Sequence, residues 1–96
     1  MALTIEKKDG VLEITGDLIG QNINFLKSHF ERLIEQKQKI IVNIENVNLM
    51  DGSSVDVFNS LHKKARKLNT SFRIMVKKNT TAKILFSKAK YLVKKK

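Results

Sequence analysis

The first part of the chain has the hydrophobic pattern of a β-hairpin. Apolar residues recur at roughly every second position in residues 3–7 and 11–16, as they do in strands with one buried face. Asp9 and Gly10 lie between these two stretches, and an Asp-Gly pair favours a tight turn because glycine accepts a positive φ. The pattern therefore predicts an antiparallel hairpin at the start of the chain.

Three later segments have the periodicity of amphipathic helices. Their apolar residues recur three or four positions apart, which places them on one face of a helix. The pattern predicts a first helix over about 21–37 and a third over 80–90. A second helix is predicted between them, with its apolar face formed by Val55, Phe58, Leu61, Ala65 and Leu68.

Further strands are predicted between these helices. Residues 40–44 are nearly all β-branched, which is typical of a strand that is buried on both faces and paired in parallel near the centre of a sheet. Residues 72–76 form a second such strand, and residues 91–93 suggest a short final one. Residues 47–54 contain turn-forming residues and are predicted to be a turn.

The resulting order of elements is β-β-α-β-α-β-α-β. Alternating strands and helices imply parallel pairing through right-handed crossovers, here after an antiparallel opening hairpin. We expect a single α/β domain over residues 1–96, with a mixed sheet of four to five strands and about three helices that cover mainly one face. The last three residues, 94–96, are expected to be a frayed basic tail.

Charge is divided unevenly along the chain. The net charge is +10, yet residues 1–56 hold nine acidic residues against six basic ones, and residues 57–96 hold thirteen basic residues and no acidic one. A surface of that kind favours acidic partners. Only three of the nineteen basic residues are Arg, the residue best suited to reading bases. We expect one solvated basic patch, formed by Lys63, Lys64, Arg66, Lys67, Lys77 and Lys78.

Several functions lack the residues that they require. The chain has no Cys and only two His, so neither a thiolate metal site nor a metal-ligand cluster is expected. No phosphate-binding glycine loop or nucleophile–base pair occurs, and we expect no enzyme activity, cofactor or metal. No apolar run approaches the roughly 20 residues that span a bilayer, and the start lacks the layout of a signal peptide. The expected location is cytoplasmic.

The segment at residues 51–54 has the chemistry of a helix start. Ser53 and Asp56 have the spacing of a capping box, in which the serine accepts a hydrogen bond from an amide and the acid reaches back to the cap. The free amides and the dipole of a helix start also favour a negative charge nearby. A phosphate on a serine in this segment would change the local surface strongly.

At this point the sequence resembles a known family, the STAS domain. The likeness covers nearly the whole chain and is carried best by residues 43–55, which read as a hydrophobic strand followed by a helix-opening motif. The family motif there is Asp-Ser-Ser-Gly; Asp51 matches its Asp, Ser53 its second Ser and Val55 the apolar residue after it. Residues 16–18 resemble the Gly-Glu-Leu that ends the second strand of the family.

The resemblance implies a bacterial regulatory protein of the anti-sigma factor antagonist type. Its partner would be an anti-sigma factor or a related serine-kinase-like protein, which phosphorylates the first Ser of the motif and so breaks the complex. Here that position is Gly52, which has no hydroxyl, and Ile19 and Ser54 replace a usual acid and glycine. We therefore expect binding without the usual switch, through Asp51, Gly52, Ser53, Ser54 and Asp56.

Other functions remain open from the sequence. Ser53 is the candidate phosphorylation site if a serine takes the place of Gly52. The fold is also compatible with reuse in another signalling or membrane-associated complex, since a fold does not fix a function. A third reading is a module that binds nucleic acid or an anionic surface through the basic half of the chain, and such binding would weaken steeply with salt.

Overall fold

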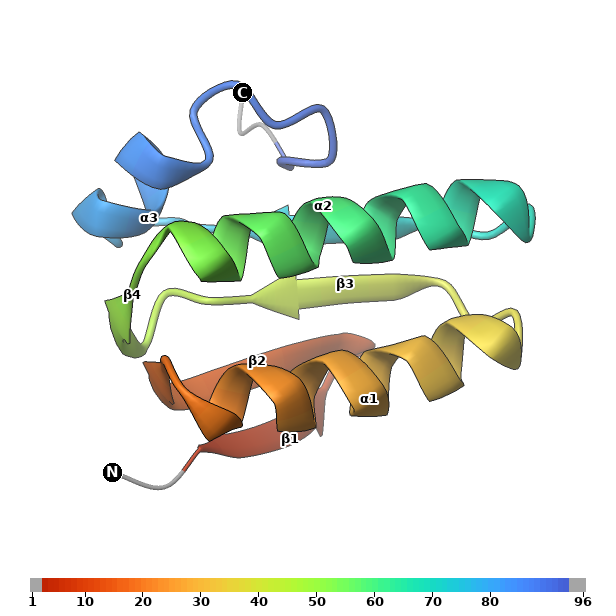
Figure 1. Cartoon of the computed structure of the whole chain (residues 1–96), viewed down its shortest axis with the longest axis horizontal. Helices are drawn as coiled ribbons and strands as arrows, with labels where there is room; N and C mark the ends of the chain where they lie inside the picture. Colours follow the sequence, from red (N-terminus) through yellow and green to blue (C-terminus); the bar gives the residue numbers. More distant parts are fainter. Residues whose placement is uncertain (1–2, 94–96) are drawn as a thin grey trace.

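The structure is a computed structural model in which residues 3–93 are described, so the predicted basic tail at 94–96 lies outside the described residues. Within these described residues, five strands and three helices follow one another (Figure 1). Their bounds are β1 Thr4–Lys8, β2 Val11–Leu18, α1 Gln21–Glu35, β3 Ile40–Asn43, β4 Val47–Met50, α2 Gly52–Lys67, β5 Phe72–Met75 and α3 Thr80–Leu85.

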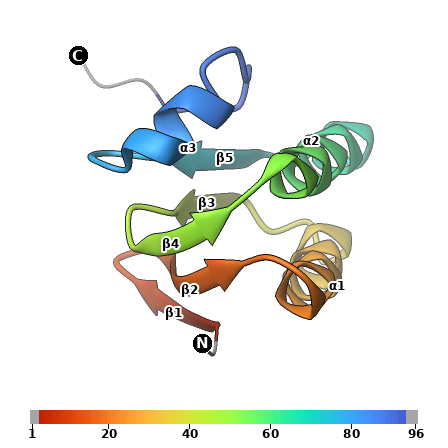
Figure 2. The same cartoon turned by 60° about the vertical axis from the view of Figure 1, so that its left-hand side comes forward.

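The strands form one mixed sheet in the order β1-β2-β3-β5, with β4 paired to β2. Strands β1 and β2 are the predicted antiparallel hairpin, and both residues of its turn, Asp9 and Gly10, have positive φ. Strand β3 pairs in parallel with both β2 and β5, which confirms its predicted central position. The mixed sheet and the opening hairpin that the sequence predicts are therefore both present (Figure 2).

Strand β2 changes its parallel partner part of the way along. Leu12 and Glu13 are paired with β3, whereas the residues from Gly16 onward are paired with β4. The register shifts between Gly16 and Asp17, and Gly16 has a φ of 120°, a region that glycine tolerates far better than other residues. Such a β-bulge bends a strand and redirects its end. Gly16 therefore turns the end of β2 toward the strand that leads into α2.

Strand β4 contradicts the prediction of a turn throughout residues 47–54. Only Val47 of its four residues is buried, and a strand of four residues is too short for its hydrophobic pattern to be distinguished from a turn in the sequence. Its pairing depends on the bulge in β2, which lies about thirty residues earlier. The side-chain amide of Asn79 also supports it, donating to the carbonyls of Ile44 at 2.9 Å and Val47 at 3.0 Å. The turn is limited to the junction with α2.

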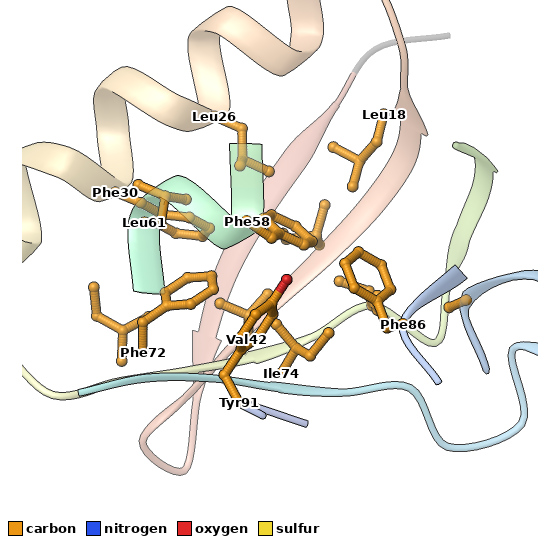
Figure 3. Packing of buried hydrophobic residues seen from close by; sticks show 14 of the residues in the cluster. Leu18, Leu26, Phe30, Val42, Phe58, Leu61, Phe72, Ile74, Phe86 and Tyr91 are labelled. Atoms are coloured by element: carbon orange, nitrogen blue, oxygen red, sulfur yellow. The ribbon is translucent and has the colours of Figure 1, made fainter. Parts of the chain in front are cut away.

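Helices α1 and α2 lie side by side on one face of the sheet, as Figures 1 and 2 show. The rings of Phe30, Phe58 and Phe72 meet between the two helices and the sheet (Figure 3). The ring centroid of Phe72 lies 6.0 Å from that of Phe30 and 5.7 Å from that of Phe58. Phe86 reaches the same core and lies 5.4 Å from Phe58. The core thus lies mainly on one side of the sheet, as the helix pattern predicts.

The C-terminal part is less regular than predicted. Helix α3 ends at Leu85 rather than continuing to residue 90, and the predicted final strand is a single β-bridge between Ile74 and Leu92. The chain turns after Phe86 because Tyr91, which is 3% exposed, must enter the core. Ile74 then donates its amide to the Tyr91 carbonyl and accepts from Val93, at 3.0 and 2.8 Å. These bonds cover part of the open edge of β5.

The bulge at Gly16 leads to a stability prediction. Gly16→Ala places a Cβ on a residue with a φ of 120°, and the resulting strain is expected to lower the free energy of unfolding by about 1–3 kcal/mol. Thr15→Ala is the control, since Thr15 is exposed on the same strand and its loss should cost less than about 0.5 kcal/mol. Urea unfolding measures both values. Equal stability of the Gly16→Ala variant and the unmodified protein would show that the bulge does not require glycine.

Candidate functional site

The junction between β4 and α2 presents a polar turn at one end of the sheet (Figure 2). Asp51 is the N-cap of α2, and its Oδ1 accepts a hydrogen bond from the backbone amide of Ser53 at 3.0 Å. The Ser53 hydroxyl donates to the same oxygen at 2.5 Å. Aspartate is a favoured N-cap residue because it satisfies amides that the helix leaves free. The turn is therefore held in place by its own side chains.

The predicted capping box is wrong in detail. It made Ser53 the cap and Asp56 the reciprocal partner, but the observed cap is Asp51, two residues earlier, and α2 begins at Gly52. Ser53 supports the cap by donating its hydroxyl to Asp51. Asp56 is exposed in the second turn of the helix. The motif predicts the location of the helix start correctly and the identity of the capping residue incorrectly.

Asp51 carries its negative charge firmly. The pKa of its carboxyl is below the usual 3.8, first because the Ser53 hydroxyl donates to the carboxylate. Burial opposes this shift, and the amides of Ser53 and Ser54 add to it. Asp51, Gly52, Ser53 and Asp56 are all exposed. The turn therefore offers two carboxylates and a hydroxyl to the solvent at neutral pH.

Ser54 faces the opposite way from the rest of the turn. Its residue is 2% exposed, and its hydroxyl donates to the carbonyl of Leu18, the last residue of β2, at 2.8 Å. Leu18 is itself 1% exposed, so this carbonyl has little access to water. The side chain of Ser54 joins the start of α2 to the end of β2 rather than facing outward with its neighbours.

Gly52 leaves open space where other residues would have a side chain. It is the first residue of α2, and a Cβ built on it meets no atom within 4 Å. Its φ is not in the left-handed region, so the backbone does not demand glycine. The structure can accept larger residues at this position.

Exposed apolar residues lie close to the turn. The register of β2 and β4 pairs Asp17 with Leu49 and Leu18 with Met50, so Ile19 and Asp51 directly follow the last pair of these two strands. Ile19 and Leu49 are 38% and 53% exposed. Apolar residues of this size at the surface are typical of contact sites when they gather next to polar groups. The two carboxylates therefore have apolar neighbours, which sequence periodicity alone did not indicate.

The predicted basic patch is not continuous. Lys77 and Lys78 follow β5 at the end of the sheet where α2 begins, whereas Arg66 and Lys67 lie where α2 ends (Figure 1). Lys64 binds Glu35 of α1 through an ion pair of 2.6 Å. The topology separates these groups because β5 and α2 run in opposite directions. Lys63 and Arg66 instead line a hollow with Lys88 and Lys90, which the predicted patch did not include.

Two further searches concern the described part of the chain. No helix within residues 3–93 is both long enough and apolar enough to cross a membrane. Over the same residues, no three His, Asp or Glu side chains gather as candidate metal ligands.

Comparison with known proteins identifies similar chains. The family model described as STAS domain matches residues 2–92. The chain is similar to the anti-sigma factor antagonist SpoIIAA in its unphosphorylated form, with a TM-score of 0.73, 17% identity, and coverage of 99% of this chain and 90% of that one. It is equally similar to the Bacillus cell fate determinant SpoIIAA in the phosphorylated form, with a TM-score of 0.73, 16% identity, and coverage of 99% and 92%. No curated protein matches the sequence significantly.

The buried bond of Ser54 can be tested by stability. Ser54→Ala removes the hydroxyl and leaves the Leu18 carbonyl without this partner, which is expected to cost about 1–3 kcal/mol of unfolding free energy. Ser53→Ala is the matched control, since that hydroxyl is exposed and the cap bond to Asp51 persists without it. Chemical unfolding of both variants gives the comparison. Equal losses in the two variants would contradict the assigned role of Ser54.

The cap assignment predicts a pH dependence. Asp51→Ala should melt at a lower temperature than Asp51→Asn, because asparagine retains a capping oxygen. The charge of Asp51 adds stability that is fully present above the ordinary pKa of 3.8 and is lost as the pH falls through the lower pKa of the folded protein. The unmodified protein should therefore melt at a higher temperature than Asp51→Asn at pH 7, and this difference should shrink as the pH falls below 3. A constant difference across this range would disprove the assignment.

Proposed function

The chain belongs to the STAS domain family, and from that premise we propose that it is a regulatory protein-binding module of the anti-sigma factor antagonist type. Its partner would be an anti-sigma factor or a related serine-kinase-like regulator. The docking surface would be the turn formed by Asp51, Gly52, Ser53 and Asp56, with Ile19 and Leu49 beside it. The likeness of the whole fold to SpoIIAA, described as an anti-sigma factor antagonist, supports this class of partner.

The observation that carries the proposal is the fixed, exposed turn at the start of α2. Two carboxylates project from it, and the Ser53 amide and hydroxyl hold the first of them in place. Such charges add specificity and association rate when they meet Arg or Lys on a partner. The neighbouring side chains of Ile19 and Leu49 supply apolar area that a partner can bury. A surface that is already ordered loses little conformational entropy on binding.

The missing hydroxyl at Gly52 suggests that binding is not switched by phosphorylation at that position. Ser53 is a poor substitute, because its Oγ lies 2.5 Å from a carboxylate oxygen of Asp51. A phosphate on the Ser53 Oγ would place nearly two negative charges beside Asp51. It would also remove the hydrogen bond that the Ser53 hydroxyl donates. We therefore propose a domain that binds its partner persistently and without phosphorylation of Ser53.

The test introduces a charge at the centre of the proposed surface. Gly52→Glu should weaken binding to the partner by about tenfold or more, since it places a negative charge at the position whose phosphorylation breaks the complex in the family that the chain resembles. Gly52→Gln is the matched control with the same shape and no charge. Both are expected to fold because the space around Gly52 is open. Titration calorimetry with the serine-kinase-like anti-sigma factors of the source organism measures the affinities.

A second variant separates binding from modification. Gly52→Ser restores a hydroxyl at the family position of phosphorylation, and the partner kinase with ATP should then modify residue 52 while leaving the unmodified protein free of phosphate. Intact-mass measurement reads this directly. If Gly52→Glu and Gly52→Gln bind as tightly as the unmodified protein, the turn is not the interface; if the kinase phosphorylates Ser53 of the unmodified protein, the persistent state is refuted.

A further inference from the structure

A second surface lies along α2, away from the turn that begins the helix. A hollow of about 350 Å³ separates the exposed side of α2 from the segment that follows α3. Its walls bring together residues that are distant in sequence: Asn59, His62, Lys63 and Arg66 from the helix and Lys88 and Lys90 from the segment. We call these six residues the basic groove. It exists because the chain turns back after Phe86 to bury Tyr91 against the helix.

The charge inside the basic groove is of one sign. Four exposed cations come from its two walls, and within residues 3–93 no carboxylate lines it. Two acidic residues of the helices could serve as counterions but lie elsewhere. Glu35 is paired with Lys64, and Asp56 lines a neighbouring hollow that Lys63 also borders. Since no acidic residue follows Asp56 in the sequence, the C-terminal wall contains no internal counterion. A concave site with uncompensated charges of one sign attracts ligands of the opposite charge.

The polar groups at the base of the groove are ordered. The Tyr91 hydroxyl donates to Oδ1 of Asn59, and burial raises the pKa of Tyr91 to about 12, so the phenol keeps its proton. The Tyr91 hydroxyl binds the side-chain oxygen of Asn59 and not its side-chain nitrogen, which carries two N–H groups. Asn59 can therefore donate to an oxygen of a ligand in the groove.

The pKa of His62 reflects its burial and the positive charge of the basic groove. Its ring packs on that of Tyr91, with centroids 4.9 Å apart. Its pKa is below the usual 6.5, first because of burial and then because of the charges of Arg66 and Lys90, while the backbone of Phe72 acts against these effects. The imidazole is therefore neutral at pH 7. The two charges act on it from opposite walls.

We propose that the basic groove binds a small anion that carries two linked phosphates, such as the diphosphate portion of a nucleotide or of another phosphorylated metabolite. The guanidinium of Arg66 can hold one phosphate through paired hydrogen bonds, and the three lysines supply point charges for the other. The volume is at the lower end of that of small-ligand sites, which begin at about 300 Å³. A nucleic acid would need a longer track of cations, and Lys77 and Lys78 do not extend this one.

The probe is inorganic pyrophosphate, titrated into the full chain at near-physiological salt. The chain contains two histidines, and only His62 lies in the groove, whereas His29 is on α1. Proton NMR of the imidazole rings should therefore show a saturable shift of His62 with His29 unchanged. Calorimetry should give a single site. The double variant Arg66→Ala with Lys88→Ala should bind pyrophosphate at least about tenfold more weakly.

The matched control removes the same charge elsewhere. Lys77→Ala with Lys78→Ala also deletes two cations, and its affinity for pyrophosphate should stay within about twofold of that of the unmodified protein. The single variant Lys88→Ala provides an independent check if the double variant is unstable. The groove variants should bind the partner of the 51–56 turn normally, so failure here is separate from failure of that function.

Three results would overturn the proposal. Binding that never saturates, or that weakens equally in the groove and control variants, would show attraction by net charge alone. Equal shifts of His62 and His29 would place the ligand outside the groove. Binding of a single-stranded oligonucleotide without binding of pyrophosphate would assign the surface to nucleic acid instead.

Discussion

The hydrogen bond from the Ser54 hydroxyl to the Leu18 carbonyl is the interaction on which the site depends. It joins the first turn of α2 to the last residue of β2, and both residues are almost completely buried. An unmade bond at that depth would cost more than the bond itself contributes, so the two ends stay together. The bulge at Gly16 makes the bond possible, because it brings the end of β2 alongside the strand that leads into α2. The exposed part of the turn is rigid because this buried part is fixed.

Much of the fold could be predicted because its signals are local. The Asp9-Gly10 turn, the β-branched run of β3 and the helical spacing of α1 and α2 each lie within a short segment. Strand β4 could not be found this way, since its pairing partner is β2 and its brace is Asn79, both remote in sequence. The early end of α3 likewise follows from the burial of Tyr91, which local spacing does not encode.

The helix start at the candidate site was predicted in place but not in detail. The motif at residues 51–54 correctly marks a helix start, yet it cannot distinguish the exposed hydroxyl of Ser53 from the buried hydroxyl of Ser54. That distinction depends on Leu18, which lies 36 residues away. The basic groove was missed for a related reason. Lys88 and Lys90 meet α2 only because the chain reverses after Phe86, so the sequence gives no sign that they share a site with Arg66.

Helix α2 therefore carries two surfaces of opposite charge, the acidic turn at its start and the basic groove further along. The most direct test of the turn as the docking surface is hydrogen–deuterium exchange of the chain alone and in complex with the proposed anti-sigma factor partner. We expect new protection of backbone amides in residues 17–20 and 47–56. Protection confined to the β1 edge or to the basic groove, with exchange in the turn unchanged, would contradict the account.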